Sequence, residues 1–150
     1  MSKKIAIGSE TMGLPLKVAL KQHLEGKGYE VIDLGIENTP IKGAKALQDG
    51  IVERAIIICG TGMNVALTAN KFKGVYCGLC ESEFTAELCK AVNNCNMLAM
   101  GARVVSEYRA NRMVDIWLST ELKDGIPEDE KQFMDIMFNN LQQIEAENMK

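Results

Sequence analysis

Apolar residues follow two different periods along this chain. Short apolar runs, several of them rich in β-branched residues, are typical of buried strands, and the stretches between them carry apolar residues at the three- and four-residue spacing of amphipathic helices. This pattern predicts strands over residues 4–8, 29–34, 55–58, 75–80 and 97–100. It predicts helices over residues 14–24, 41–52, 65–70, 83–92, 107–118 and 128–149.

The regular alternation of strands and helices predicts the fold class. Five strands separated by helices favour one parallel sheet with helices on both faces, and right-handed crossovers make such a sheet doubly wound. We therefore expect an α/β protein with a five-stranded, Rossmann-like three-layer sandwich and a long C-terminal helix. Residues 1–150 form one domain in this interpretation, with a core over residues 3–121 and a helical extension over residues 127–149.

The predicted C-terminal helix is polar except for one apolar stripe. The stripe repeats at intervals of three and four residues, through Met134, Met137, Leu141 and Ile144. A helix this polar gains most of its stability from packing its apolar face. We expect the stripe to dock against the body of the protein or against a sister subunit.

Composition and charge exclude several classes of function. The net charge of -3 argues against nucleic acid as a partner, and no run approaches the roughly 20 apolar residues that a membrane span requires. No G-x-G-x-x-G follows the first strand, and no P-loop lysine occurs, although the Gly-Thr-Gly turn at 60–62 leaves a nucleotide-binding, flavodoxin-like domain as a weaker alternative.

The cysteines point to a reducing compartment. The chain has 5 cysteines, an odd number, and residues 1–4 lead into a short strand rather than a hydrophobic targeting segment. We expect free thiols in a cytoplasmic protein. Cys77-x-x-Cys80 has the spacing of a zinc or redox pair, but no second pair follows and His23 is the only histidine. We interpret the two cysteines as strand-end residues, expect no metal, and place His23 in solvent on a surface helix.

The most informative stretch runs from residue 55 to residue 64. A β-branched strand stops at Cys59, and the turn Gly60-Thr61-Gly62 leads into a helix. Ligands of open parallel sheets bind beyond the carboxyl ends of the strands, and the amides at a helix start favour negative charge. The same field favours a thiolate over a thiol. Cys59 is thus a candidate base beside an anion-binding turn, suited to an enediolate. The alternatives are a small apolar strand-end residue for Cys59 and a helix cap for Thr61.

At Ile58-Cys59-Gly60-Thr61-Gly62 the chain resembles the B-type ribose-5-phosphate isomerases and the related galactose-6-phosphate isomerase subunits, LacA and LacB. The resemblance covers residues 3–121 in order and spacing, and the long final helix is more similar to the galactose-phosphate branch. The segments that carry it are residues 4–9, 28–33, 58–62, 69–74, 96–104 and 116–121.

The resemblance implies isomerisation of a phosphorylated sugar through a cis-enediolate, without a cofactor or metal. Cys59 would move the proton between C2 and C1, and Thr61 would hydrogen-bond the reacting oxygens. The enediolate charge would be held by the backbone amides of Gly60, Gly62, Met63 and Asn64.

The resemblance also implies a site shared between the subunits of a homodimer or tetramer. Asn93 matches a residue that contacts the substrate, and Arg103 matches a basic residue that binds phosphate across the dimer interface. Glu10 and Thr11 stand where the family has Asp-His, also against the substrate. A salt bridge at an interface is the alternative role for Arg103, and a first-turn helix acid is the alternative for Glu10.

Other positions depart from the family. Val92 occupies the place of the histidine that opens the sugar ring, and Asn64 that of a glycine in the central turn. Ile126, Pro127 and Glu130 occupy the places of the phosphate-binding Arg-His cluster. One hypothesis is an isomerase of a sugar that needs no ring opening, such as a tetrose phosphorylated at O4. The other is a non-catalytic or companion-dependent subunit that binds sugar phosphates.

Overall fold

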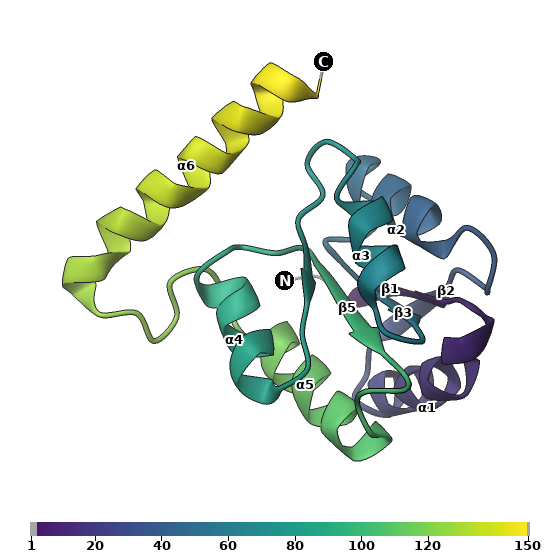
Figure 1. The fold of residues 1–150 in the computed structure, drawn as a ribbon. Coiled ribbons are helices and arrows are strands. Elements are labelled where there is room, and N and C mark those ends of the chain that lie inside the picture. Colours follow the sequence, from purple (N-terminus) through teal and green to yellow (C-terminus); the bar gives the residue numbers. More distant parts are fainter. Residues whose placement is uncertain (1–2, 150) are drawn as a thin grey trace.

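The computed structural model describes residues 3–149 and contains one sheet of five parallel strands in the order β2-β1-β3-β5-β4 (Figure 1). The chain thus places β2 on one side of β1 and β3, β5 and β4 on the other, with β5 between β3 and the edge strand β4, which confirms the predicted doubly wound topology. The strands are β1 (Lys4–Ser9), β2 (Glu30–Asp33), β3 (Arg54–Cys59), β4 (Cys77–Leu79) and β5 (Met97–Gly101).

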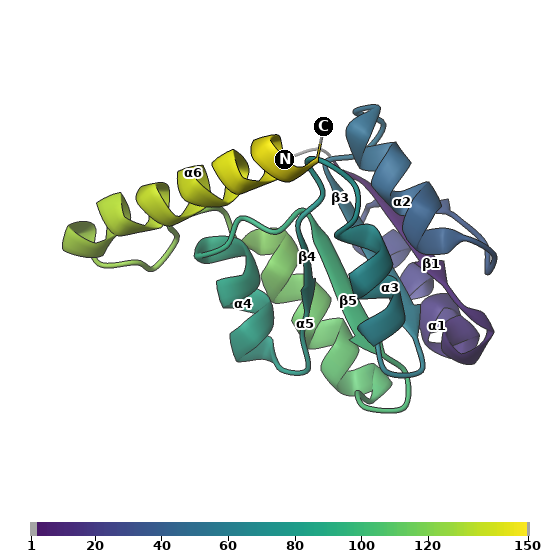
Figure 2. The same cartoon turned by 45° about the horizontal axis from the view of Figure 1, so that its top comes forward.

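Helices cover both faces of the sheet, and one helix extends beyond them (Figures 1 and 2). One face is covered by α1 (Leu14–Gly26), α4 (Glu83–Ala91) and α5 (Glu107–Ser119). The other is covered by α2 (Thr39–Gln48) and α3 (Met63–Ala69). Two short 3-10 turns, η1 (Thr11–Gly13) and η2 (Glu128–Glu130), precede α1 and the last helix, α6 (Lys131–Asn148).

The two faces of the sheet have different cores. Trp117 of α5 is fully buried on the first face, together with Leu20 of α1 and Leu98 of β5. On the second face, small residues such as Ala44 and Ala69 allow α2 and α3 to approach the sheet closely. The β3 side chains from Ala55 to Ile58 are fully buried between these layers, so the central strand is held rigidly from both sides.

Helix α2 and strand β4 are among the predicted elements whose bounds differ from those expected. Helix α2 starts at Thr39, with Pro40 in its first turn where a missing amide costs nothing, and it ends before Gly50, whose φ is +68°. Strand β4 is shorter than predicted because side chains take its first backbone amides. Asn96 Oδ1 accepts from the Tyr76 amide at 2.9 Å, and Asn70 Oδ1 accepts from the Cys77 amide at 2.8 Å.

The prediction for His23 was wrong, because its ring does not lie free in solvent. His23 Nε2 lies 2.7 Å from Asp115 Oδ1 on α5, and Lys27 Nζ donates to Asp115 Oδ2 at 2.7 Å. These contacts join α1 to α5. They connect residues that are far apart in the sequence, so helix periodicity alone could not show them.

Helix α6 projects from the body of the protein, and its C-terminal end lies near the start of β4 (Figures 1 and 2). The C-terminal end of α6 is held by Glu145, which accepts hydrogen bonds from the Gly74 amide at 2.9 Å and the Tyr76 hydroxyl at 3.0 Å. Met134 is buried, whereas Leu141 and Ile144 of the predicted stripe are 43% and 50% exposed. The body thus covers only part of the stripe. Within residues 3–149, no helix has the length and apolar character needed to cross a bilayer.

Candidate active site

Cys59 is the last residue of β3 and lies at the carboxyl edge of the sheet. Its Sγ accepts a hydrogen bond from the Gly62 amide at 3.1 Å. The side chain is 8% exposed, whereas the four preceding residues of the strand are fully buried. Cys59 is therefore still buried, and its side chain packs with the α2 and α3 layer, although it is slightly more exposed than the rest of the strand.

Glycine is required at two places for the turn after Cys59 to pack as it does. Gly62 has a φ of +82°, and a Cβ there would lie 2.5 Å from Leu79 Cδ1. A Cβ on Gly101, the β5 residue paired with Cys59, would lie 2.6 Å from the Thr61 Cα. The turn is thus pressed against the end of β5, which fixes the position of Thr61 beside Cys59.

The hydrogen bonds inside the turn use two of the four amides expected to hold an enediolate. The Gly62 amide donates to Cys59 Sγ, and the Met63 amide donates to Thr61 Oγ1 at 3.3 Å. The alternative of Thr61 as the helix cap was wrong, because Gly62 is the N-cap residue of α3. The side chains of Thr61, Met63 and Asn64 are exposed around the turn.

Arg103 lies against the same turn of its own chain. The Arg103 amide donates to the Gly60 carbonyl at 3.0 Å, and Arg103 Cδ lies 3.7 Å from the Cβ position of Gly60. Its guanidinium is 3.8 Å from Met12 Sδ, and no carboxylate within residues 3–149 forms an ion pair with it. A second chain is therefore not needed to bring this cation to the turn.

Glu10 and Thr11 also lie at this edge of the sheet. The Glu10 amide donates to the Ile58 carbonyl at 2.8 Å, which holds the end of β1 beside the end of β3. Glu10 precedes η1, and α1 begins only at Leu14 without an acidic residue in its first turn. The alternative interpretation of Glu10 as a first-turn acid of that helix was therefore wrong.

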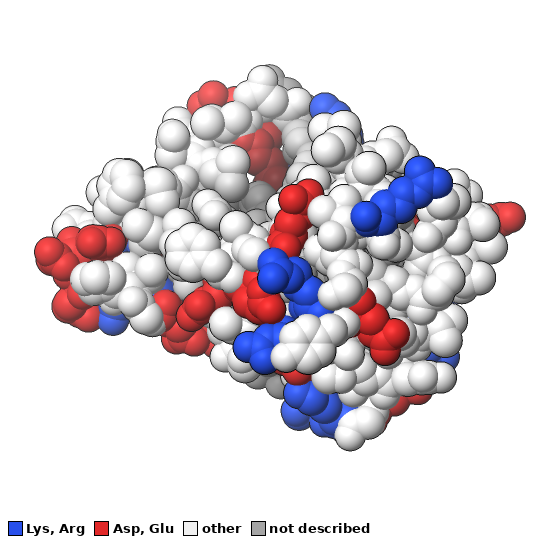
Figure 3. All heavy atoms as spheres, turned by 60° about the horizontal axis from the view of Figure 1, so that its bottom comes forward, with Lys and Arg blue, Asp and Glu red and all other residues white. Residues whose placement is uncertain are grey.

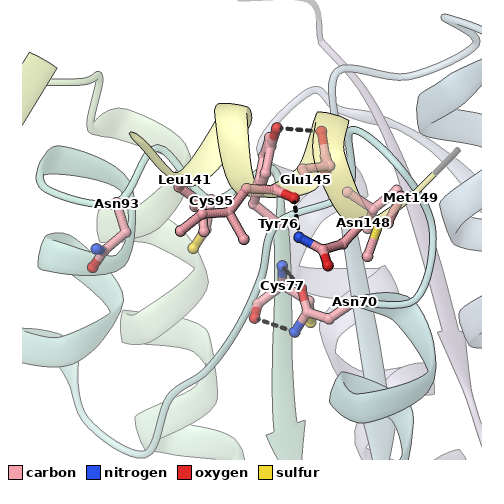
Figure 4. A pocket seen from close by; sticks show the side chains of 11 residues that line it. Asn70, Tyr76, Cys77, Asn93, Cys95, Leu141, Glu145, Asn148 and Met149 are labelled. Carbon is pink, nitrogen blue, oxygen red and sulfur yellow. Dashed lines mark hydrogen bonds between the residues drawn. The ribbon is translucent and has the colours of Figure 1, made fainter. Parts of the chain in front are cut away.

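Asn93 lies at the opposite, amino edge of the sheet, where α4 ends. It lines a cavity of about 330 Å³ between the start of β4 and α6, together with Tyr76, Cys77 and Glu145 (Figure 4). Burial, followed by the hydrogen bond to Glu145, raises the pKa of Tyr76, so the phenol stays protonated there. One chain thus does not bring Asn93 to Cys59.

Three departures from the family, at Val92, Ile126 and Pro127, lie at the same amino edge as Asn93. Val92 directly follows α4, and the Lys123 amide donates to the Ala91 carbonyl at 2.8 Å, which ties the segment after α5 to this end of α4. Ile126 and Pro127 follow within that segment. Each chain therefore presents the turn of Cys59 at one edge and the Asn93 region at the other.

Three features of the site escaped the sequence reasoning. Met12 contacts Arg103, and Tyr76 and Glu145 join α6 to the cavity at the amino edge. No sequence pattern indicated these three residues. The glycine at position 101 was different, because a glycine directly after an apolar strand is visible in the sequence.

Charges and potential metal ligands are dispersed. Lys and Arg side chains are interspersed with Asp and Glu on the face shown in Figure 3, rather than gathered into one broad basic area. Within residues 3–149, no three His, Cys, Asp or Glu side chains are grouped so that they could hold a metal ion.

The profile of the ribose/galactose isomerase family matches residues 5–136. The chain belongs to this family. The family and the isomerase activity inferred from the resemblance are thereby confirmed. A ribose-5-phosphate isomerase B of Clostridium thermocellum has a similar structure, with a TM-score of 0.88 at 33% identity, covering 96% of this chain and 98% of that one.

Two sequence relatives are isomerases named for four-carbon compounds. The 4-deoxy-4-sulfo-D-erythrose isomerase of Clostridium sp. strain MSTE9 is 40% identical over 141 residues, 87% of this chain and 88% of its own length. The D-erythrulose-4-phosphate isomerase of Pectobacterium atrosepticum is 33% identical over 130 residues, 81% of this chain and 86% of its own length.

Proposed function

We propose that this isomerase interconverts the aldose and ketose forms of an open-chain, four-carbon sugar with a phosphate or sulfonate at C4. The observation that carries the proposal is the pairing of Cys59 at a donor-rich turn with Val92 at the ring-opening position. The first supports proton transfer between carbons, and the second supports a substrate that has no ring to open.

In the proposed reaction, the Cys59 thiolate removes the proton from C2 of the aldose and returns it to C1, while the hydroxyl proton moves from O2 to O1, which gives the ketose. The reverse reaction begins with the proton on C1 of the ketose. The intermediate is a cis-enediolate, whose charge lies on the two oxygens. The Thr61 hydroxyl and the amides of the turn stabilise that charge, and each preorganised donor of this kind typically lowers a barrier by about 3 kcal/mol. The amides of Gly62 and Met63 now donate to Cys59 Sγ and Thr61 Oγ1, and in the proposed reaction they also donate to the substrate oxygens.

The four-carbon preference follows from the chemistry of ring closure. A tetrose needs a free hydroxyl at C4 to form a five-membered ring, and a phosphate ester or a sulfonate at C4 removes that hydroxyl. Valine has no ionisable group, so Val92 cannot supply the proton that opens a ring. The two four-carbon relatives act, by their names, on compounds of this type.

The same preference agrees with the distribution of cations. Ile126, Pro127 and Glu130 provide no positive charge for a distant phosphate, whereas Arg103 lies beside the turn and has no carboxylate partner within residues 3–149. A shorter carbon chain brings the anion nearer to Cys59. Arg103 is therefore the proposed ligand of the C4 substituent, through charge-assisted hydrogen bonds.

The proposal places the complete site between two chains. Asn93 is supplied by the amino edge of a second copy, which also covers the exposed apolar residues of α6 such as Phe133 and Ile136, 58% and 57% exposed. Replacement of both by glutamate should convert a dimer into monomers in light scattering, whereas the nearby Gln132→Glu should not. A protein that remains dimeric with both glutamates would contradict this assignment of α6.

A panel of phosphorylated and sulfonated sugars tests the reaction. Erythrose 4-phosphate, erythrulose 4-phosphate, 4-deoxy-4-sulfoerythrose, ribose 5-phosphate and galactose 6-phosphate would be incubated with the wild type, Cys59→Ala and the control Cys80→Ala. We expect turnover of a four-carbon compound, lowered by about 10²- to 10⁴-fold in Cys59→Ala because a general base is lost. Turnover of ribose 5-phosphate alone would refute the substrate, and full activity of Cys59→Ala would refute the base.

The companion-dependent subunit is the second candidate, favoured by the unmatched positions Val92 and Glu130. It predicts no turnover of any compound in the panel by the purified chain, and activity once a related chain that carries the missing histidine is added. Turnover by the purified chain alone excludes it.

A further inference from the structure

Four cysteines that the proposed reaction does not use converge on Gly78. Cys77 starts β4, Cys80 follows this strand, Cys89 lies in the last turn of α4, and Cys95 lies between α4 and β5. A Cβ on Gly78 would overlap Cys89 Sγ and would lie 3.4 Å from Cys95 Sγ. The sulfurs of Cys89 and Cys95 therefore occupy the space that a side chain at position 78 would fill.

The backbone holds Cys89 and Cys95 at a separation that a disulfide can bridge. The Cys95 amide donates to the Cys89 carbonyl at 3.0 Å. With standard bond lengths, that hydrogen bond keeps the two Cα atoms within about 7 Å of each other. Disulfides usually join Cα atoms about 4.4–6.8 Å apart, so little backbone movement is needed.

A small oxidant can reach this pair. A cavity of about 260 Å³ is lined by Leu88, Cys89, Asn93 and Cys95, and Cys80 also borders it. Both thiols are nearly buried, Cys89 at 6% and Cys95 at 8% exposure, which limits reaction with large reagents. Two thiols this close to each other and next to a cavity can be oxidised to a disulfide.

We propose that Cys89 and Cys95 form a reversible disulfide when the protein meets hydrogen peroxide. One sulfur attacks the O–O bond and becomes a sulfenic acid, releasing one water. The other sulfur displaces the hydroxyl group and loses its proton, forming the S–S bond and releasing a second water. Two thiols are oxidised and one peroxide is reduced, and a dithiol reductant reverses the change.

The disulfide would close a ring around the segment that carries Asn93. Between the two cysteines, Asn94 has a φ of +52° and accepts a hydrogen bond from Lys90 Nζ at 2.8 Å. A bond of about 2.05 Å between the two sulfurs would tie the end of α4 to the loop after it. The consequence, loss of isomerase activity on oxidation, rests on the proposed function, in which Asn93 contacts the substrate of the partner chain.

Cys80 competes for the same oxidant. The Cys89 thiol donates a hydrogen bond to Cys80, which lowers the pKa of Cys80 and raises that of Cys89. A lower pKa favours the thiolate form of Cys80, which is the nucleophilic form. The experiment must separate a Cys89–Cys95 bridge from a Cys80–Cys89 bridge.

Trypsin makes that separation because Lys90 lies between the two candidate partners. Cleavage after Lys73, Lys90 and Arg103 yields peptide 74–90, with Cys77, Cys80 and Cys89, and peptide 91–103, with Cys95. After peroxide treatment and blocking of free thiols, mass spectrometry should detect the two peptides joined, in the wild type and in Cys80→Ser. The joined species should disappear in Cys89→Ser and in Cys95→Ser. A bridge confined to peptide 74–90, or no bridge at all, would overturn the proposal.

Activity measurements test the consequence separately. Peroxide should inactivate the wild type faster than Cys95→Ser. Dithiothreitol should then restore the activity that the wild type lost through the disulfide. Equal inactivation of both proteins would assign the loss to Cys59 and would overturn the regulatory role. If the untreated chain has no isomerase activity, the proposed function fails, whereas the peptide mapping still decides whether the disulfide forms.

Discussion

Gly101→Ala is the substitution that most directly tests the geometry of the turn after Cys59. Gly101 ends β5 in register with Cys59, and a Cβ there would lie 2.6 Å from both the Cα and the carbonyl carbon of Thr61. These are backbone atoms, so they cannot rotate away as a side chain could. Gly101 is not among the glycines with positive φ, so alanine fits the local backbone and the effect comes from the contact alone.

The size of the effect can be worked from that contact. Carbon atoms prefer a separation of about 3.5–4.0 Å, so the alanine methyl group must push the turn away by about 1 Å. A displacement of about 1 Å in a catalytic group can cost about 10²-fold in rate, equivalent to about 2.7 kcal/mol of barrier height. Overpacking of this kind also destabilises the fold by about 1–3 kcal/mol.

Steady-state kinetics and thermal unfolding together measure these two effects. We expect kcat/KM of Gly101→Ala to fall by about 100-fold while the protein remains folded at assay temperature, with a Tm lowered by about 2–4 °C for each kcal/mol lost. Gly26→Ala is the matched control, because nothing lies within 4 Å of its added Cβ. Wild-type kinetics in Gly101→Ala would refute the claim that β5 positions Thr61.

Three further predictions concern binding, stability and pH. Arg103→Met should raise KM for the anionic substrate by about 10- to 100-fold, the worth of a hydrogen bond to a charged group, whereas the exposed Arg112→Met should leave it unchanged. Trp117→Ala should cost about 3–5 kcal/mol in a denaturant titration, because the side chain is fully buried. Burial would raise the pKa of Asp33, but hydrogen bonds from Lys17 and Gly35 lower it overall. Asp33 therefore stabilises the fold above its unfolded pKa of about 4, and the Tm difference between wild type and Asp33→Asn should vanish as the pH falls through the lowered pKa of the folded protein.

The sheet and the turn at Cys59 were predictable because local patterns determine them. Apolar runs of β3 and β5 mark buried parallel strands, and glycines at 60, 62 and 101 mark the tight approach at their ends. The end of α2 was misplaced because the pattern continued through Ile51 and Val52, whereas Gly50 adopts a left-handed conformation that ends the helix.

Contacts between distant segments could not be predicted in the same way. The position of His23 depends on Asp115 of another helix, and the anchoring of α6 depends on a single acid, Glu145. The placement of Asn93 at the far edge depends on the antiparallel course of α4 relative to its neighbouring strands. Each of these follows from the three-dimensional path of the chain rather than from any local sequence period.

The separation of Cys59 and Asn93 on opposite edges has a consequence for mixed assemblies. In a two-fold dimer that joins the carboxyl edge of one chain to the amino edge of the other, each dimer contains two active sites. In each active site, Cys59 comes from one chain and Asn93 from the other. Cys59→Ala and Asn93→Ala would then each be inactive alone, yet a chain of one kind paired with the other would contain one intact centre. Random re-association of equal amounts should restore about one quarter of the wild-type rate, because half of the dimers are mixed and each mixed dimer has one of its two centres intact.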